Sequence, residues 1–465
     1  MTLIKSISGI RGTIGGKPDQ GLTPVDAVKY ASAYGTWLLG SNKGTKKSKV
    51  VIGRDARLSG QMVSNLVSAT LIGLGIDVID LGLSTTPTVE MAVTELSAQG
   101  GIILTASHNP KQWNALKLLN EKGEFISEQI GQEILKLAEA ADFNFAEVNN
   151  LGKYTVNTDF LNTHIEKILA LPYVDVKAIQ KADFTIVVDA INSSGGIAVP
   201  QLLEKLGVKK IKVIHGEPTG DFAHNPEPLP AHLSDLSNTV KKQKAHLGIS
   251  VDPDVDRLAF VCEDGEMFGE EYTLVAVADY VLKHNKKGNT VSNLSSTRAL
   301  RDVTEAQGGK YSASAVGEVN VVNMMKETKA VIGGEGNGGI ILPELHYGRD
   351  ALVGIAIFLT HLAKYGKSAS MLRSSYPGYF ISKNKIELTP EINVDKVLNA
   401  VKTKYKKQPV NTIDGVKIEF GKEWVHLRKS NTEPIIRIYS ESETEATADN
   451  LAKKIISDIK EIIRS

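Results

Sequence analysis

The 465-residue sequence predicts an α/β protein with three similar α/β domains with mixed sheets, followed by a C-terminal α+β domain. Short apolar runs rich in β-branched residues alternate with segments of helical periodicity, which is typical of parallel strands joined by helical crossovers. The pattern restarts after residue 183 and again at residue 258, and the length fits several domains better than one large sheet. Near the end of the sequence, strands instead group beside one amphipathic helix.

The three α/β blocks follow the same order of elements. In the first, strands and helices are expected to alternate over residues 50–53, 61–73, 78–83, 89–96 and 101–106. The second has expected strands at 184–190, 211–215 and 247–251 and a helix at 197–206. The third is expected to begin with a strand at 258–261, followed by a helix near 272–282 and strands at 290–294 and 331–332. Ligands usually bind beyond the carboxyl ends of such strands, so polar clusters there are candidate sites.

The C-terminal block has a different pattern. A strand is expected at 383–388, a helix at 394–405, and further strands within 410–420 and 425–440, with an Asp414-Gly415 turn signal. Leucine and isoleucine then repeat at helical spacing from Leu451 to Ile463. Pro377 and Gly378 interrupt the pattern, which indicates a linker near 374–378. These breaks predict four domains, over residues 1–150, 151–257, 258–373 and 374–465.

Composition excludes several classes of protein. Lys plus Arg is 54 and Asp plus Glu is 53, so the sequence has no global basic field for nucleic acid and no polycationic face for a membrane. The single cysteine, Cys262, allows neither an internal disulfide nor a cysteine-based zinc cage. Residues 1–5 lack a signal-peptide core, and the apolar run at 353–360 is too short for a membrane span. We therefore expect a cytoplasmic protein.

The first candidate site is a serine on a turn. Asn109 and Pro110 end an apolar strand and leave the hydroxyl of Ser107 available, with Lys117 a few residues further on. Taken alone, a Ser-His pair such as Ser107-His108 more often marks a capped turn than a functional site. The G-x-S-x-G elbow that holds the nucleophilic serine of α/β-hydrolases is absent. A serine without an adjacent base could still carry a phosphoryl group if a metal balanced its charge.

Three alternating aspartates provide a candidate metal site. Asp252, Asp254 and Asp256 follow an apolar strand, and Pro253 stiffens the bend between them. Three carboxylates in a curled loop suit a hard cation such as Mg²⁺, and Arg257 adds a fork that matches phosphate oxygens. The spacing resembles the opening of an EF-hand, but the required glycine is replaced by Arg257 and a strand follows instead of a helix. The alternative is a solvated acidic turn.

A glycine-rich loop spans residues 333–339. It matches G-x-G-x-x-G, yet a strand-like run follows it, whereas dinucleotide binding requires a helix N-terminus there. What remains is a loop presenting Glu335 and Asn337, a carboxylate and an amide that can grip sugar hydroxyls. The alternative is a tight hairpin with incidental polar residues.

A candidate anion cradle lies near the end of the sequence. Arg428, Ser430, Asn431 and Thr432 stand in one turn and Arg437 lies just beyond it. Guanidinium groups, small hydroxyls and free backbone N–H groups make a plausible phosphate site. As an isolated signal it is equally consistent with a surface loop.

Taken in order, these four clusters resemble the α-D-phosphohexomutase family. TASHNP with Asn114 and Lys117 is similar to the family's phosphoserine loop, and DPDVDR keeps the aspartates and arginine of its usual DGDGDR metal loop. GEGNGG is similar to its sugar loop and RKSNTEP to its phosphate loop, and SGIRG and GRDARLSG near the start also match. The resemblance covers essentially the whole sequence.

The resemblance implies four domains around a central cleft and a set of residue roles. Ser107 would be carried as phosphoserine and would ligate one Mg²⁺ together with Asp252, Asp254 and Asp256, while Arg257 contacts the phosphoserine. Glu335 and Asn337 would hold the sugar. The non-reacting phosphate would be held by Arg428, Ser430, Asn431, Thr432 and Arg437.

The implied reaction isomerises a hexose 6-phosphate and its 1-phosphate through a hexose 1,6-bisphosphate, which serves as activator and intermediate. One departure affects proton transfer. Many members have a histidine at the last position of the sugar loop, where this sequence has Gly339. Arg11, His108 and Lys117 are the remaining candidates for handling the proton, a task typically worth about 10²–10⁴-fold in rate.

The sugar is the least defined part of the prediction. The small residues of the sugar loop resemble those of phosphoglucosamine mutases, so we expect glucosamine 6-phosphate and glucosamine 1-phosphate, with phosphomannomutase/phosphoglucomutase activity as the close alternative. A phosphosugar phosphatase or a catalytically silent binding protein are further alternatives. The expected partner is a phosphosugar rather than nucleic acid or a membrane, and the sequence does not indicate an oligomeric state.

Overall fold

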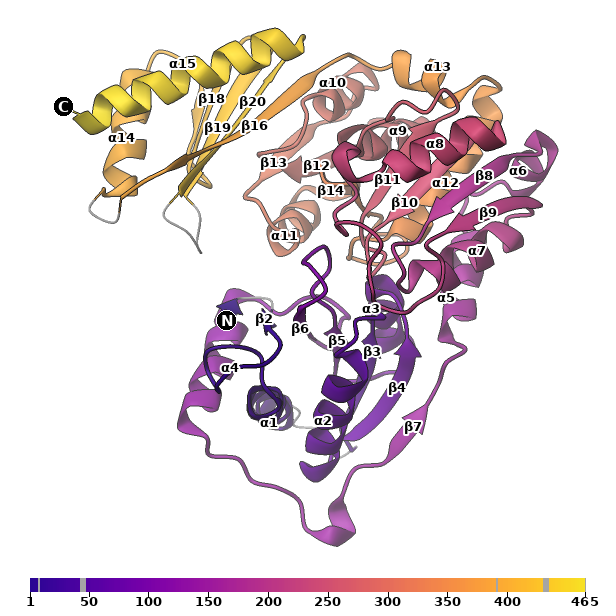
Figure 1. The fold of residues 1–465 in the computed structure, drawn as a ribbon, viewed down its shortest axis with the longest axis vertical. Coiled ribbons are helices and arrows are strands. Elements are labelled where there is room, and N and C mark those ends of the chain that lie inside the picture. Colours follow the sequence, from indigo (N-terminus) through magenta and orange to yellow (C-terminus); the bar gives the residue numbers. More distant parts are fainter. Residues whose placement is uncertain (7–8, 42–46, 390–391, 430–434, 465) are drawn as a thin grey trace. The chain divides into compact units, whose positions relative to one another are not determined.

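The computed structural model describes residues 1–465 apart from 7–8, 42–46, 390–391, 430–434 and 465. The elements gather into two compact units, Met1–Tyr280 with Asn337–Leu372 and Val281–Gly336 with Arg373–Ser465. Each unit is built from sheets with helices packed on them (Figure 1).

The first sheet of the first unit has seven strands in the order β1-β2-β6-β5-β3-β4-β7. The strands β3, β4, β5 and β7 run parallel, whereas β1, β2 and β6 pair antiparallel, so the sheet is mixed. The strand bounds are β1 Leu3–Ser6, β2 Gly9–Thr13, β3 Lys49–Arg54, β4 Asp77–Leu83, β5 Gly100–Leu104, β6 Trp113–Leu119 and β7 Tyr154–Val156.

Helices cover both faces of this sheet. Val50 and Ile52 of β3 belong to an apolar core shared with α1, α2 and α4, whereas the intervening Val51 belongs to a second core with Val89 of α3. Because side chains alternate along a strand, β3 is apolar on both faces and reads as a continuous hydrophobic run. The helices are α1 Pro24–Ser41, α2 Gly60–Gly73, α3 Thr86–Glu95 and α4 Glu128–Ala140.

The second sheet has the order β11-β10-β8-β9. Its strands β8 (Thr185–Asp189), β9 (Lys210–Ile214) and β10 (Leu247–Val251) are parallel. The strand expected to open the third block, β11 (Leu258–Cys262), instead pairs antiparallel with β10. That expectation is wrong because β11 returns directly after the aspartate loop, which is too short for a parallel crossover.

Further elements connect and cover these sheets, and their bounds are η1 Val148–Asn150, α5 Phe160–Leu169, α6 Val176–Ala182, α7 Gly195–Lys205, η2 Pro230–His232, α8 Ser234–Gln243, α9 Glu270–His284, β15 Gly339–Ile341, α12 Ala351–Tyr365 and α13 Ala369–Ser374. No helix among the described residues combines the length and the apolar character needed to cross a membrane. The apolar run at 353–360 lies inside α12, where residues 351–362 are all buried.

The second unit contains two sheet regions. Three parallel strands are ordered β13-β12-β14, with bounds β12 Asn289–Asn293, β13 Tyr311–Ser314 and β14 Ala330–Glu335, and they pack with α10 (Ala299–Ala306) and α11 (Glu318–Thr328). The other sheet is wholly antiparallel, in the order β16-β20-β19-β18-β17. Its bounds are β16 Phe380–Glu387, β17 Val410–Asn411, β18 Val416–Phe420, β19 Glu423–Lys429 and β20 Ile435–Ser442.

The antiparallel sheet has a core of its own. The helices α14 (Val394–Lys404) and α15 (Glu445–Arg464) supply Val401, Ile455 and Ile459 to a cluster with Ile418 and Ile438 of the sheet. Figure 1 shows α15, in yellow, running along this sheet. The predicted fold class is confirmed, because mixed α/β sheets precede an antiparallel C-terminal sheet; the four domain boundaries stay a prediction.

Candidate active site

Ser107 stands on a tight turn that follows β5. Its backbone has a φ of +48°, in the left-handed region that residues with a side chain rarely adopt. The backbone N–H donates a hydrogen bond to the hydroxyl of Thr105 at 2.9 Å. The serine is buried, and its Oγ faces the aspartate loop. A strained turn that aims one hydroxyl into a charged site is typical of a functional residue.

Arg57 holds this turn from behind. Its guanidinium donates to the carbonyl oxygens of Asn109 at 2.6 Å, Pro110 at 2.8 Å and Trp113 at 2.9 Å, and also to the carbonyl of Ser107. Its Nε donates to Asp55 at 3.0 Å, and both side chains are fully buried. The segment GRDARLSG contains both partners of this ion pair, and its sequence alone favours a structural ion-pair turn over residues 53–57.

The aspartate loop begins where β10 ends. Asp252 Oδ1 accepts the backbone N–H groups of Asp256 and Arg257, both at 3.1 Å, so the chain curls around this carboxylate. Asp252 Oδ2 accepts the hydroxyl of Ser107 at 2.6 Å. Val255 adopts a φ of +61° at a position where the family motif has glycine, so the turn keeps its shape despite the side chain.

The three carboxylates converge as the alternating pattern predicted. Each of Asp252, Asp254 and Asp256 is fully buried, and one oxygen from each lies within 4.8 Å of the others. Burial and the neighbouring Asp256 and Asp254 raise the pKa of Asp252 well above its usual range. Three buried carboxylates repel one another, so they require a cation.

Two cationic side chains supply part of that charge. Lys117 of β6 places its Nζ 2.7 Å from Asp254 Oδ2 and 3.5 Å from Asp256 Oδ2. Arg349 donates to Asp256 Oδ2 at 2.7 Å. Burial opposes the charge on Lys117, but the Asp254 and Asp256 carboxylates together raise its pKa. Arg349 was absent from the sequence-based assignments because nothing local in its segment signals an acidic partner.

A metal ion fits the oxygens that remain. Asp254 Oδ1 and Asp256 Oδ1 are buried and have no hydrogen-bond partner among the described residues. Orphaned carboxylate oxygens beside a serine hydroxyl are the donor set that a hard divalent cation takes. The structure therefore supplies a candidate metal-binding acidic triad.

Further polar groups surround the serine. His108 Nδ1 lies 3.5 Å from Ser107 Oγ, while Arg11 of β2 donates to Asn109 Oδ1 at 2.9 Å and Arg257 pairs with Glu227 at 3.3 Å. Burial, together with the charges of Arg257, Arg11 and Arg349, lowers the pKa of His108 to about 2. Its imidazole is therefore neutral and a weak base at physiological pH.

The segment that carries Arg349 is fixed by a polar network. His346 lies 3.3 Å from Glu90 Oε2 and 3.3 Å from Asp350 Oδ2, and His164 lies 2.9 Å from the same Asp350 oxygen. The other oxygen of Asp350 caps the first turn of α12 by accepting two backbone N–H groups. This network holds both ends of the short stretch from His346 to Asp350.

Gly339 also bears on Arg349. A Cβ at this position would lie 2.4 Å from Arg349 Cδ. The absence of a side chain at 339, where many family members have histidine, therefore makes room for the arginine that reaches Asp256. A local pattern could not reveal this pairing, because ten residues separate the two positions.

The sugar-loop residues fall in both units. In the second unit Glu335 ends β14, is buried, and accepts hydrogen bonds from Asn293 Nδ2 at 2.9 Å and the Gly317 backbone N–H at 3.2 Å. In the first unit Asn337 Oδ1 accepts the backbone N–H of Gly339 at 3.2 Å. Both side chains are thus held in defined orientations within their own unit.

Two arginines of the predicted anion cradle lie opposite each other. Arg428 of β19 and Arg437 of β20 are paired in the antiparallel ladder, and Arg428 Nε lies 2.9 Å from Asp414. Like charges at opposed positions are unfavourable unless an anion lies between or near them. The other predicted members, Ser430, Asn431 and Thr432, lie outside the described residues.

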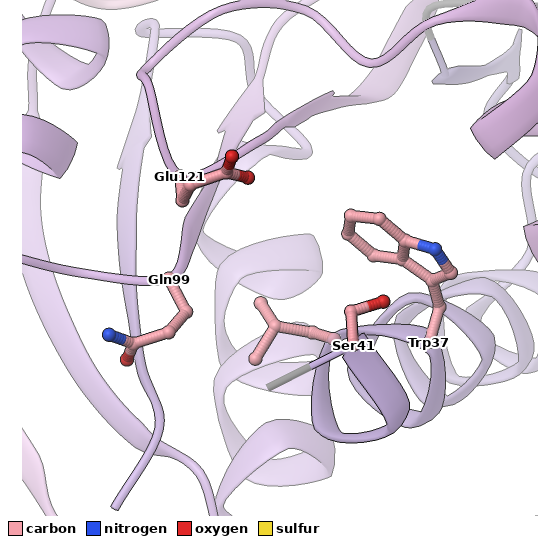
Figure 2. A pocket seen from close by; sticks show the side chains of 5 residues that line it. Trp37, Ser41, Gln99 and Glu121 are labelled. Carbon is pink, nitrogen blue, oxygen red and sulfur yellow. The ribbon is translucent and has the colours of Figure 1, made fainter. Parts of the chain in front are cut away.

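A surface pocket elsewhere on the first unit has a different character. Figure 2 shows Trp37 and Ser41 of α1 with Gln99 and Glu121, which lie beside β5 and β6. Its volume is about 190 Å³, and it includes none of the predicted site residues.

Four family models together match most of the chain. Residues 3–145, 162–265 and 269–379 match the α/β/α domains I, II and III of phosphoglucomutase/phosphomannomutase, and residues 385–457 match its C-terminal domain.

Individual proteins are similar along their full length. A phosphoglucomutase/phosphomannomutase of Thermococcus kodakarensis is 36% identical over 458 residues, which cover 97% of this chain and 99% of the relative. A probable phosphoglucosamine mutase of Pyrococcus horikoshii is 34% identical over 461 residues, 98% of each chain. The crystal structure of a phosphoglucomutase/phosphomannomutase family protein from Burkholderia thailandensis superimposes with a TM-score of 0.83 at 26% identity and covers 98% of this chain and 96% of its own.

Proposed function

The chain belongs to the phosphoglucomutase/phosphomannomutase family of phosphohexomutases, and from that premise we propose that it interconverts glucosamine 6-phosphate and glucosamine 1-phosphate through a phosphorylated Ser107. We further propose Mg²⁺ as its metal, a hexose 1,6-bisphosphate as intermediate and activator, and the cytoplasm as its location.

The contact between Ser107 and Asp252 carries the assignment of the phosphorylated residue. Their side chains come from positions 145 residues apart, yet the serine Oγ donates to the aspartate Oδ2 at 2.6 Å. Three buried carboxylates beside one serine hydroxyl carry more negative charge than a structural hydrogen bond requires. We propose that they bind a cation, and that this cation offsets the charge of the phosphoryl group on Ser107.

The residues present divide the work of the reaction. The phosphoryl group passes from Ser107 Oγ to one hydroxyl of the sugar phosphate, and Oγ takes up a proton. After the bisphosphorylated sugar reorients in the site, Ser107 Oγ attacks the other phosphoryl group and the sugar oxygen is protonated. Asp252, Asp254 and Asp256 together with Ser107 would hold the Mg²⁺, which would supply charge neutralisation for the phosphoryl group. Arg257, Arg11 and Arg349 offset the remaining charge in a partly dry site.

Lys117 is our candidate for handling the proton. Its Nζ lies against Asp254 and Asp256 of the acidic triad, whose third member, Asp252, accepts the hydroxyl of Ser107. His108 suits that role less well, because its low pKa makes it a poor base at neutral pH. Arg11 contributes charge and holds Asn109 of the serine turn.

The remaining assignments concern sugar and phosphate. We propose that Glu335 and Asn337 bond the sugar hydroxyls and that Arg428, Ser430, Asn431, Thr432 and Arg437 bind the phosphate that does not react. Two similar phosphate positions would let one site accept the sugar in both orientations. The name of the Pyrococcus horikoshii relative and the small residues of the sugar loop favour an amino sugar.

Two measurements test the proposal. Peptide mass spectrometry of purified protein should find phosphate on Ser107, and Ser107→Ala should abolish mutase activity. Unmodified Ser107 in a fully active enzyme would contradict the mechanism. Steady release of inorganic phosphate without a bisphosphate requirement would instead indicate a phosphatase.

Coupled assays with glucosamine, glucose and mannose 1-phosphates address the sugar. We expect the highest kcat/KM with glucosamine 1-phosphate. A preference of tenfold or more for mannose or glucose 1-phosphate, about 1.4 kcal/mol in transition-state binding, would favour the second candidate, phosphomannomutase/phosphoglucomutase activity. That candidate is supported by the name of the Thermococcus kodakarensis relative.

A further inference from the structure

A second cluster of metal-ligating side chains lies at the carboxyl ends of β8 and β9. Asp189 is the last residue of β8, His215 directly follows β9, and His224 lies further along the same loop. One potential ligand atom from each lies within 4.8 Å of the others. None of the three takes part in the site around Ser107. Carboxyl ends of parallel strands are the usual position for a ligand.

The imidazoles aim one nitrogen each at the same carboxylate. His215 Nδ1 lies 3.2 Å from Asp189 Oδ1, and His224 Nε2 lies 2.9 Å from Asp189 Oδ2. The carboxylate is fully buried, whereas the two histidine side chains are 22% and 17% exposed. The cluster therefore has a closed inner side and an accessible outer side.

The outer nitrogen of each ring faces an oxygen atom, at hydrogen-bond distance for His224 and at ion-pair distance for His215. His224 Nδ1 lies 2.8 Å from the backbone carbonyl oxygen of Asn225, and His215 Nε2 lies 3.7 Å from Asp235 Oδ2. In protein metal sites a ligating histidine typically donates its second N–H to a carbonyl or a carboxylate, which fixes the tautomer and leaves the inner nitrogen free to bind. His224 shows that arrangement, and Asp235 provides a carboxylate at ion-pair distance from the outer nitrogen of His215.

The backbone around the cluster supports a fixed geometry. His215, Ile191 and Asn192 all adopt positive φ values, between 47° and 51°. Three residues with side chains in the left-handed region at one sheet edge cost free energy, so the surrounding contacts must hold them in place. The strained backbone and the converging side chains both indicate a ligand site of fixed geometry.

We propose that Asp189, His215 and His224 form a binding site for a divalent transition-metal ion, of which Zn²⁺ is the probe of choice. Two imidazole nitrogens and one carboxylate oxygen suit Zn²⁺ and related ions, whereas Mg²⁺ prefers oxygen ligands alone. The site would thus differ in metal preference from the acidic triad. Three protein ligands leave a position open to water or to a small anion.

Calorimetric titration of the full-length protein with Zn²⁺ tests the site. Excess Mg²⁺ is present to occupy the acidic triad. We expect one tight Zn²⁺ per chain for wild type and loss of that binding in the double variant His215→Gln/His224→Gln. The matched control is His246→Gln, which changes an exposed histidine outside the cluster and should bind as wild type does.

An outer-position variant covers the case in which the double variant fails to fold. Asp235 is exposed, so Asp235→Ala should leave the fold intact while weakening Zn²⁺ binding by about tenfold or more. Co²⁺ in place of Zn²⁺ should give visible ligand-field absorption that disappears in His224→Gln. If wild type, the double variant His215→Gln/His224→Gln and Asp235→Ala all bind Zn²⁺ with equal affinity, the proposal is overturned. The cluster would then be an internal ion pair.

Discussion

Arg57 shows how one side chain shapes the serine turn. Its guanidinium contacts four backbone carbonyl groups and is anchored by the buried Asp55. No other residue type offers a rigid planar fork with that many donors. The positive φ of Ser107, and therefore the direction of its hydroxyl, depends on this clamp.

Arg57→Lys should misplace Ser107. The lysine keeps the charge but cannot reach all the carbonyl groups, so the free energy of unfolding should fall by at least about 1.5–3 kcal/mol, the value of one charge-assisted hydrogen bond. We expect kcat to fall more than KM rises, measured by steady-state assay alongside urea unfolding. The control is Lys111→Met, which breaks an exposed ion pair with Asp221 and should change stability by less than about 1 kcal/mol. Unchanged kcat in Arg57→Lys would refute the clamp.

Gly339 and Arg349 form the second residue-scale device. Gly339→Ala should push Arg349 away from Asp256, because the added Cβ would lie 2.4 Å from Arg349 Cδ. A displacement of about 1 Å in an active site can cost on the order of 100-fold in rate. Steady-state kinetics should therefore show a large loss of kcat with the fold intact.

The comparison for this variant is Gly40→Ala. Gly40 lies in α1, and a Cβ there meets no heavy atom within 4 Å, so activity should stay near wild type while stability stays the same or rises by up to about 1 kcal/mol. Full activity of Gly339→Ala would show that Arg349 does not need its observed position.

At the scale of elements, the network of Glu90, His164, His346 and Asp350 joins α3, α5 and the start of α12. Burial disfavours the charged form of His346, but hydrogen bonds to Asp350 and Glu90 raise its pKa to about 10. A histidine in an unfolded chain titrates near 6.5. The charged imidazole therefore stabilises the folded state fully below pH 6.5, and this contribution is lost as the pH rises toward 10.

His346→Gln should remove that pH dependence. We expect the free energy of unfolding of wild type to fall between pH 6.5 and pH 10 by more than that of the variant, and the gap between the two proteins to narrow as the pH rises. Urea unfolding at several pH values measures it. Parallel curves for the two proteins would mean that His346 carries no extra proton in the folded state.

At the scale of the whole molecule, the chain folds around several separate cores. The cluster that joins α14 and α15 to the antiparallel sheet shares no member with the clusters of the first sheet. Multidomain chains of this kind commonly deviate from two-state unfolding. We therefore expect more than one calorimetric transition.

Ile455→Ala should assign one of those transitions. Ile455 is fully buried in the α15 core, and its truncation should cost about 2–5 kcal/mol there. Scanning calorimetry should show one transition shifted down and the others unmoved. The exposed Ile413→Ala is the matched control and should shift nothing. A uniform shift of all transitions would indicate a single cooperative unit.

The sequence by itself determined the local features of this protein. Hydrophobic periodicity located the strands β3, β4, β5, β8, β9, β10, β12 and β14 and the helices α2, α3, α7 and α9, since a strand apolar on both faces and a helix with an apolar stripe each leave a local signal. It left many other elements without an expectation, among them the helices α1, α4, α5 and α8. Periodicity failed for α12, which is buried all round, and for β11, whose pairing direction depends on the length of the preceding loop. The order of the polar motifs identified the family and the residue types of the site.

Only the tertiary structure decided which of those residues meet. It brought Asp252 to Ser107 and Lys117 to Asp254, and it showed that Arg57 holds the serine turn. It also added Arg349, which no local pattern marks. The physical reason is that a buried charge must be satisfied by whatever group lies nearest in space. Its partner can stand more than a hundred residues away in the chain, as Asp252 does from Ser107.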